Sequence, residues 1–70
     1  MAKKIKIAPT FKIFSVNTTE NEIGEAVGYS KDEAIWSFLR NEGLEDDAIR
    51  GVIKTKRYNG NGIIAREVKR

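Results

Sequence analysis

A helix with a signal at each end is the feature that most limits how these 70 residues can fold. Ser30 precedes a helical pattern and Glu33 follows it by three residues, which is the spacing of an N-terminal capping box. Gly43 stands where a left-handed residue ends a helix, and Leu44 can then fold back onto the last turn. The sequence therefore predicts a long helix over residues 30–44.

The apolar side chains of this helix share one face. Ala34, Ile35, Phe38 and Leu39 recur at intervals of one, three and four residues. A helix buries such a stripe against another element, and the neighbouring segments of this chain resemble strands. We therefore expect the helix to cover one face of a β-sheet.

The residues before the helix predict a β-hairpin. Residues 11–16 are rich in aromatic and β-branched side chains, and residues 22–29 follow them after a polar turn. Gly24, Ala26 and Gly28 fall on one side of the second strand. Their small side chains are expected to let the helix approach closely.

The residues after the helix predict a short turn and a second hairpin. Residues 44–49 suit a single helical turn capped by an aspartate. Residues 50–58 and 63–69 are expected to be strands, because the loop 59–62 between them has the sequence Asn-Gly-Asn-Gly. Both residues of an Asn-Gly pair tolerate positive φ, so this pair is a strong hairpin signal.

The loop also predicts a register for the second hairpin. If Tyr58 pairs with Ile63, then Lys56 lies opposite Ala65, and Lys54 lies opposite Glu67. The other face of the hairpin then carries apolar residues, which we expect on the core side: Ile53, Ile64 and Val68.

These elements predict a two-layer α+β fold. An antiparallel β-sheet of about four strands packs against one α-helix, in the order β-β-α-β-β. Residues 1–70 form a single small domain, since no linker or repeat divides the chain. Residues 1–9 are expected to be an N-terminal arm or an edge strand, because Pro9 lacks a backbone N–H for a sheet ladder.

The side-chain chemistry argues against an enzyme. The chain has no histidine and no cysteine, which removes the commonest bases and nucleophiles and the usual zinc ligands. Its glycines match neither the dinucleotide nor the P-loop spacing. The acidic residues in 42–47 lack the spacing of a calcium loop and suit helix caps and solvated surface. We predict no catalytic residues, no cofactor and no metal site.

The charges are segregated along the chain. Residues 1–16 carry four lysines and no acid, residues 17–49 carry nine acids and two bases, and residues 50–70 carry seven bases and one acid. Such asymmetry indicates a surface for nucleic acid, or else parts that neutralise one another after folding. In the first case the last hairpin contacts nucleic acid mainly through phosphates, using Lys54, Lys56, Arg57, Tyr58, Arg66, Lys69 and Arg70.

The second face of the predicted sheet also carries apolar side chains, which something must bury. The strand 11–16 offers apolar side chains to both faces, and one helix covers only one of them. The N-terminal arm, a second copy in a homodimer and a ligand are the three open alternatives. If the ligand is single-stranded nucleic acid, we expect it to contact aromatic and apolar residues of this face that are interleaved with Lys54 and Lys56. These residues are Val27, Tyr29, Tyr58 and Ile63.

The alternative function is a protein-interaction module, such as an inhibitor or an assembly factor. It would use the free sheet face or a free edge together with Trp36 and Tyr29. Trp36 lies toward the flank of the helix, so we expect it to be only partly buried beside the core.

Residues 1–7 carry charge and no apolar stretch of the signal-peptide type, and no later run approaches membrane-spanning length. We expect a cytoplasmic protein without a membrane partner. Its small size and lack of cofactor motifs are typical of proteins encoded by phages or other mobile elements.

Overall fold

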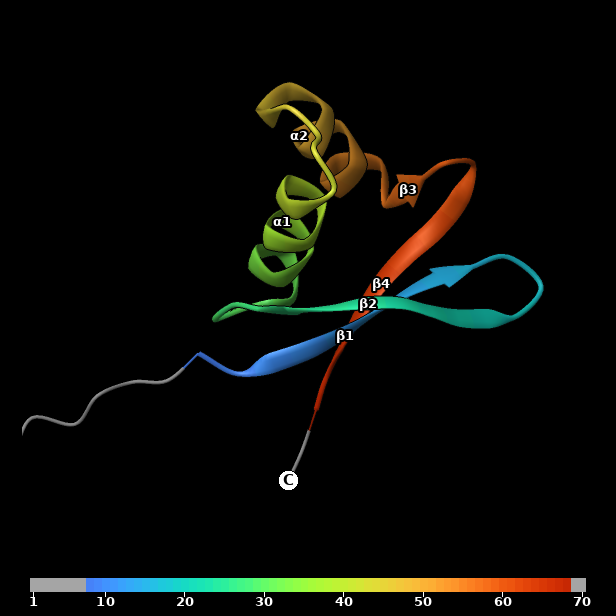
Figure 1. Cartoon of the computed structure of the whole chain (residues 1–70). Helices are drawn as coiled ribbons and strands as arrows, with labels where there is room; N and C mark the ends of the chain where they lie inside the picture. The colour runs from blue at the N-terminus through green and yellow to red at the C-terminus, as the bar shows by residue number, and fades with distance from the viewer. Residues whose placement is uncertain (1–7, 69–70) are drawn as a thin grey trace, which may run out of the picture.

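The structure, a computed structural model, describes residues 8–68. The strands form one antiparallel sheet in the order β2-β1-β4-β3, and both helices lie on the same side of it (Figure 1). Along the chain the elements are β1 (Thr10–Val16), β2 (Glu20–Val27), α1 (Lys31–Asn41), α2 (Asp46–Thr55), β3 (Arg57–Tyr58) and β4 (Asn61–Glu67).

The predicted first hairpin is confirmed. β1 pairs with β2 through a turn in which the Oδ1 atom of Asn17 accepts hydrogen bonds from the backbone N–H groups of Thr18 and Thr19. The register shifts where Ile13 faces Gly24 and the next residue of β1 faces Glu22, so β2 carries a one-residue bulge.

The predicted signals at both ends of α1 are also confirmed. Ser30 Oγ accepts a hydrogen bond from the backbone N–H of Glu33 at 3.1 Å, and Glu33 Oε1 accepts one from the N–H of Tyr29 at 3.1 Å. Gly43 has a φ of 96°, in the left-handed region that glycine tolerates best. After it, the N–H of Leu44 donates to the carbonyl of Leu39 at 3.1 Å. These local bonds explain why the helix could be predicted without its partners.

The small residues in and directly after β2 let α1 approach the sheet, as predicted. A Cβ atom on Gly28 would lie 2.6 Å from the backbone nitrogen of Ala34. A Cβ atom on Gly24 would collide with the ring of Phe38. Ala26, between these two glycines, is buried.

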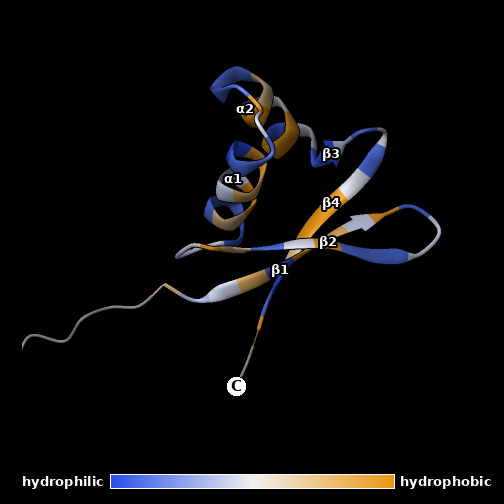
Figure 2. Cartoon of the chain, viewed as in Figure 1, coloured by the Kyte–Doolittle hydropathy of each residue, from blue (hydrophilic) through white to orange (hydrophobic). Residues whose placement is uncertain are grey.

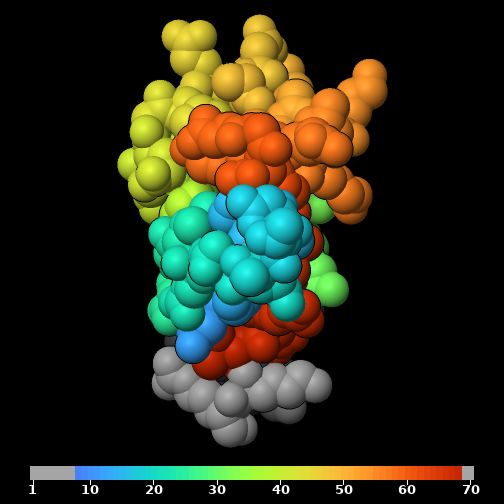
Figure 3. Space-filling view, turned by 90° about the vertical axis from the view of Figure 1, so that its right-hand side faces the viewer, coloured from blue at the N-terminus to red at the C-terminus, as the bar shows by residue number. Residues whose placement is uncertain are grey.

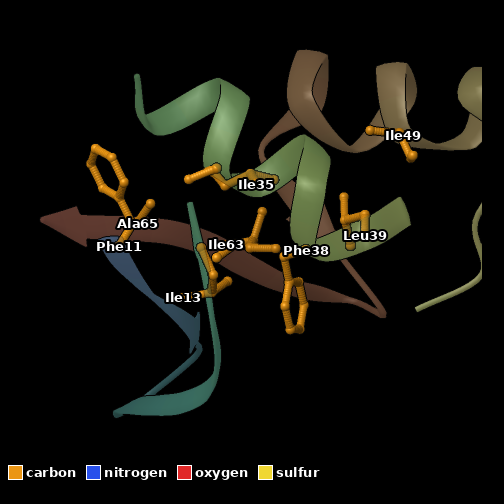
Figure 4. Packing of buried hydrophobic residues seen from close by; sticks show 10 residues of the cluster. Phe11, Ile13, Ile35, Phe38, Leu39, Ile49, Ile63 and Ala65 are labelled. Atoms are coloured by element: carbon orange, nitrogen blue, oxygen red, sulfur yellow. The ribbon is translucent and has the colours of Figure 1, made fainter. Parts of the chain in front are cut away.

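The core lies between the sheet and the two helices. Figure 2 shows the apolar residues gathered where the helices meet the sheet, and Figure 4 shows how their side chains converge. All four apolar residues predicted on the face of α1 are buried. The buried cluster contains Phe11, Ile13, Ala26, Ala34, Ile35, Phe38, Leu39, Ile49, Ile63 and Ala65.

The prediction of one helix is wrong, because the described residues contain a second one. Residues 46–55 form α2 in place of the predicted turn and the start of a strand, so the order is β-β-α-α-β-β. Ile49, Val52 and Ile53 are spaced by three and four residues, which gathers them on the side of α2 that packs on the core. The four-stranded antiparallel sheet and the α+β class are confirmed.

The predicted register of the second hairpin is wrong by two residues. Tyr58 pairs with Asn61, and only Asn59 and Gly60 form the loop. Both loop residues have positive φ, 54° and 81°, which is the pattern of a two-residue type I′ turn. Lys54 and Lys56 precede β3, so neither lies opposite Ala65 or Glu67 as predicted.

The predicted core side of β4 is wrong as well. Ile63 and Ala65 are buried, whereas Ile64 and Val68 are only partly buried and alternate with them. Ile53 does pack against the core, but from α2. β1 decides the orientation of β4, because its buried Ile13 lies directly opposite Ala65.

Candidate nucleic-acid interface

The cations of residues 8–68 divide into two groups. One group is held in ion pairs: Lys12 with Glu22 at 3.6 Å, Arg50 with Asp47 at 3.5 Å, Arg66 with Glu20 at 2.6 Å, and Arg40 with Asp46. The other group has no ion pair with any described residue and contains Lys31, Lys54, Lys56 and Arg57.

Three of these unpaired cations lie at the corner where α2 runs into β3. Lys54 is in the last turn of α2, Lys56 caps that helix, and Arg57 begins β3. All three side chains are exposed. Figure 3 shows the side chains of this part of the chain, in orange, projecting at the upper right of the molecule. We call Lys54, Lys56 and Arg57 the basic corner.

Lys56 has a backbone conformation that lysine rarely adopts. Its φ of 58° and ψ of 35° are left-handed, and glycine is the usual residue at such a helix end. A side chain in this region costs roughly 1–2 kcal/mol. The conformation is held because the N–H of Lys56 donates to the carbonyl of Val52 at 2.7 Å, while its own carbonyl accepts from Ile63 at 3.1 Å.

A shallow hollow of about 450 Å³ lies beside the basic corner. Asn17 and Asn61 also line it, and the Nδ2 atom of Asn17 donates to Oδ1 of Asn61 at 3.5 Å. Lys56 and Arg57 line the hollow together with these amides. Cations and amide donors around an open depression suit an anion such as a phosphate group.

Tyr58 and Arg66, two further residues predicted to contact nucleic acid, do not add to the basic corner. Tyr58 is half-buried and packs against the core, so its ring is not a free platform for a base. Arg66 is paired with Glu20, and its guanidinium carbon lies 5.9 Å from the centre of the Phe14 ring. Lys69 and Arg70 lie outside the described residues.

The face of the sheet opposite the helices differs from the predicted aromatic and basic surface. Phe14 lies between Glu22 and Ile64 on the neighbouring strands, and Lys12 lies between Glu25 and Arg66. Among the described residues of this face, Glu20, Glu22 and Glu25 of β2 outnumber the cations Lys12 and Arg66, so these residues offer no excess of positive charge. Ile63 is instead buried in the core, and Tyr58 packs against that core. Lys54 and Lys56 lie in α2 and at its end, so the predicted placement of these four residues on the open face is wrong.

Two residues predicted for partner binding lie near α1. Trp36 is partly buried and packs against the core cluster, as expected from its place on the helix flank. Tyr29 precedes the N-cap and is 60% exposed, and Val27 is 51% exposed. Neither Tyr29 nor Trp36 lines the hollow at the basic corner.

Sequence reasoning missed Lys31. It is the first residue of α1 and lines a separate groove together with Lys56. No pattern in the sequence marks it, because its proximity to Lys56 depends on how α1 packs beside α2.

Within residues 8–68, no group of three or more acidic side chains is arranged to hold a metal ion. Neither described helix has the length and apolar character needed to cross a membrane. Comparisons of the chain with protein-family models, with curated proteins and with solved structures gave no match.

Proposed function

We propose that this protein is a non-enzymatic module that binds the phosphates of nucleic acid through its basic corner. The proposal rests on one observation, the division of the described cations into those with an ion-pair partner and those without one. Those on the sheet and at the junction of the helices are held by carboxylates, whereas Lys54, Lys56 and Arg57 have no ion pair with a described residue.

The left-handed lysine supports the same proposal. Glycine at position 56 would relieve the backbone cost, but it would also remove a cation from the corner. Strained residues cluster at functional sites, so the presence of lysine here is consistent with a role in binding.

Phosphate contacts position a protein on nucleic acid without reading its bases. We therefore expect little sequence preference and a strong dependence on salt. Three phosphate contacts give a slope of log affinity against log salt of about −2 to −3, because each contact releases condensed counterions.

Fluorescence anisotropy with labelled single- and double-stranded DNA and RNA, over a series of salt concentrations, tests this proposal. The double variant Lys54→Gln and Arg57→Gln should weaken binding at every sequence and reduce the size of the slope by about 2. The matched control is Arg40→Gln with Arg50→Gln, which removes the same charge from two paired positions and should change the slope far less.

A third variant separates binding from stability. Lys56→Gly should reduce the size of the slope by about 1 and leave the fold at least as stable as before. The proposal is overturned if the wild-type protein does not bind at low salt. Equal losses of oligonucleotide affinity in the basic-corner variant and in its control would also overturn the proposal, because net charge alone would then explain binding.

A further inference from the structure

The outer edge of β4 has no strand partner beyond Gly62 within residues 8–68, because β3 pairs only with Asn61 and Gly62. The N–H of Ile63 donates to Lys56 on this outer side, whereas the N–H of Val68 donates to β1 on the other side. Backbone groups alternate in direction along a strand. The N–H and C=O groups of Ala65 and Glu67 therefore point toward the free edge.

A groove of about 280 Å³ runs beside this edge. Its walls come from the first turns of α1 and the last turns of α2, and β4 supplies the remaining side. Figure 4 shows Ile35 of α1 close to Ile63 of β4, and both residues line the groove. The apolar side chains that line the groove are Ile35, Val52, Ile53, Ile63, Ile64 and Ala65.

The groove has an excess of positive charge. Lys31 and Lys56 line it from opposite helices, and neither forms an ion pair with a described residue. Asp32 is the one carboxylate among its described lining residues, and it lies in the first turn of α1, where the helix dipole favours it. Arg66 also contributes to the lining, with its guanidinium bound to Glu20.

We propose that the groove receives an extended acidic segment of a partner protein, which adds to the sheet as a strand beside β4. Its backbone bonds to the free groups of Ala65 and Glu67, as in other cases of strand addition. An apolar side chain of the segment enters between Val52 and Ile53, while flanking carboxylates reach Lys31 and Lys56.

Two other occupants fit less well. A groove that holds the bases of single-stranded nucleic acid usually offers aromatic rings for stacking, and no aromatic residue is among the described residues lining this groove. A second copy could offer its acidic edge strand β2. However, that edge is interrupted by a bulge, and Glu20 and Glu22 are already paired with Arg66 and Lys12.

The test begins with selection of random peptides from a display library on the immobilised protein. We expect enriched peptides to carry aspartate or glutamate on both sides of an apolar residue. The selected peptide is then synthesised and titrated into the labelled protein, with amide NMR signals as the readout. The largest shifts should occur at Lys31, Ala65 and Glu67.

Edge variants make the test specific for strand addition. Ala65→Pro removes the central free N–H, but Ala65 is buried and this variant risks unfolding. Glu67→Pro removes the next free N–H at an exposed position and should lower peptide affinity about tenfold, because a backbone bond is lost. Glu67→Thr removes the same charge, keeps the N–H and should bind as the wild type does.

Three outcomes would overturn the proposal: no enrichment of acidic peptides, equal affinity for the proline and threonine variants, or peptide shifts confined to the open face of the sheet. Sedimentation could instead show self-association that depends on concentration. If Glu67→Pro abolishes that self-association, the occupant of the groove is a second copy of the protein. Glu67→Pro leaves the basic corner intact, so it should not alter binding of oligonucleotides. The two proposals can therefore fail independently.

Discussion

Gly28 and Gly51 show how one residue type has opposite effects at two places in this molecule. Gly28 is buried, and the backbone of α1 lies where its Cβ atom would be. Gly51 is exposed within α2, and apart from its chain neighbours and the backbone of its own helix no described atom lies within 4 Å of the place where its Cβ atom would be. The first glycine is required by close packing, whereas the second only weakens its helix.

Replacement of each glycine by alanine should therefore change stability in opposite directions. Gly28→Ala should lower the free energy of unfolding by about 1–3 kcal/mol, because the backbone of α1 must move away from β2. Gly51→Ala should raise it by about 1 kcal/mol, because alanine favours the helix. Urea unfolding of both variants measures the difference, and a neutral Gly28→Ala would mean that α1 is not packed closely on β2.

At the scale of elements, α2 is the main difference from the predicted fold. Its residues include valine, isoleucine and threonine, which favour strands, and its apolar spacing is short enough to suit either structure. The helix forms because Ile49 becomes fully buried against α1, with Val52 and Ile53 packed around the same core. Packing between distant segments thus overrides local preference, as it often does for short elements.

The contribution of α2 to stability can be measured at Ile49. Ile49→Ala should lower the free energy of unfolding by about 2–5 kcal/mol, because it leaves a cavity in the core. If that variant does not fold, Ile49→Val should still show a loss of about 0.5–1.5 kcal/mol.

The matched control for Ile49 is its neighbour Arg50, whose ion pair with Asp47 is solvent-exposed. Arg50→Ala should change the free energy of unfolding by no more than about 0.5 kcal/mol, since exposed ion pairs contribute little. Similar losses in the Arg50 and Ile49 variants, measured by thermal unfolding, would contradict the packing of α2 on the core.

At the scale of the whole molecule, one core connects every layer. Side chains from β1, β2, β4, α1 and α2 meet in a single buried cluster, and the described residues include no second cluster. Small domains with one core unfold cooperatively. The sheet and both helices should therefore lose their structure together.

Two optical signals test this cooperativity. Trp36 fluorescence reports on packing around α1, while far-UV circular dichroism reports on both helices and on the sheet. Their urea transitions should coincide, with one midpoint and one slope. An earlier circular dichroism transition would indicate that α2 unfolds before the rest of the molecule.

The candidate site was predictable only in part. The cations of the basic corner were identified from charge alone, since Lys54, Lys56 and Arg57 are close together in the sequence. The sequence could not show that Arg66 is held in an ion pair and so does not belong to the candidate site, because its partner Glu20 is 46 residues away. The groove beside β4 could not be predicted from the sequence either. It exists because β3 is only two residues long and two helices lie beside the edge of β4 that β3 leaves exposed.

The sequence by itself determined α1, its two ends, the first hairpin and the small residues beneath the helix. These features rest on bonds and sterics within a few residues of the chain, such as the capping box of Ser30 and Glu33. Only the tertiary structure decided that residues 46–55 are a helix, which face of β4 is buried and which cations lack a partner. Those outcomes depend on burial and ion pairing between distant segments, and no local pattern records them.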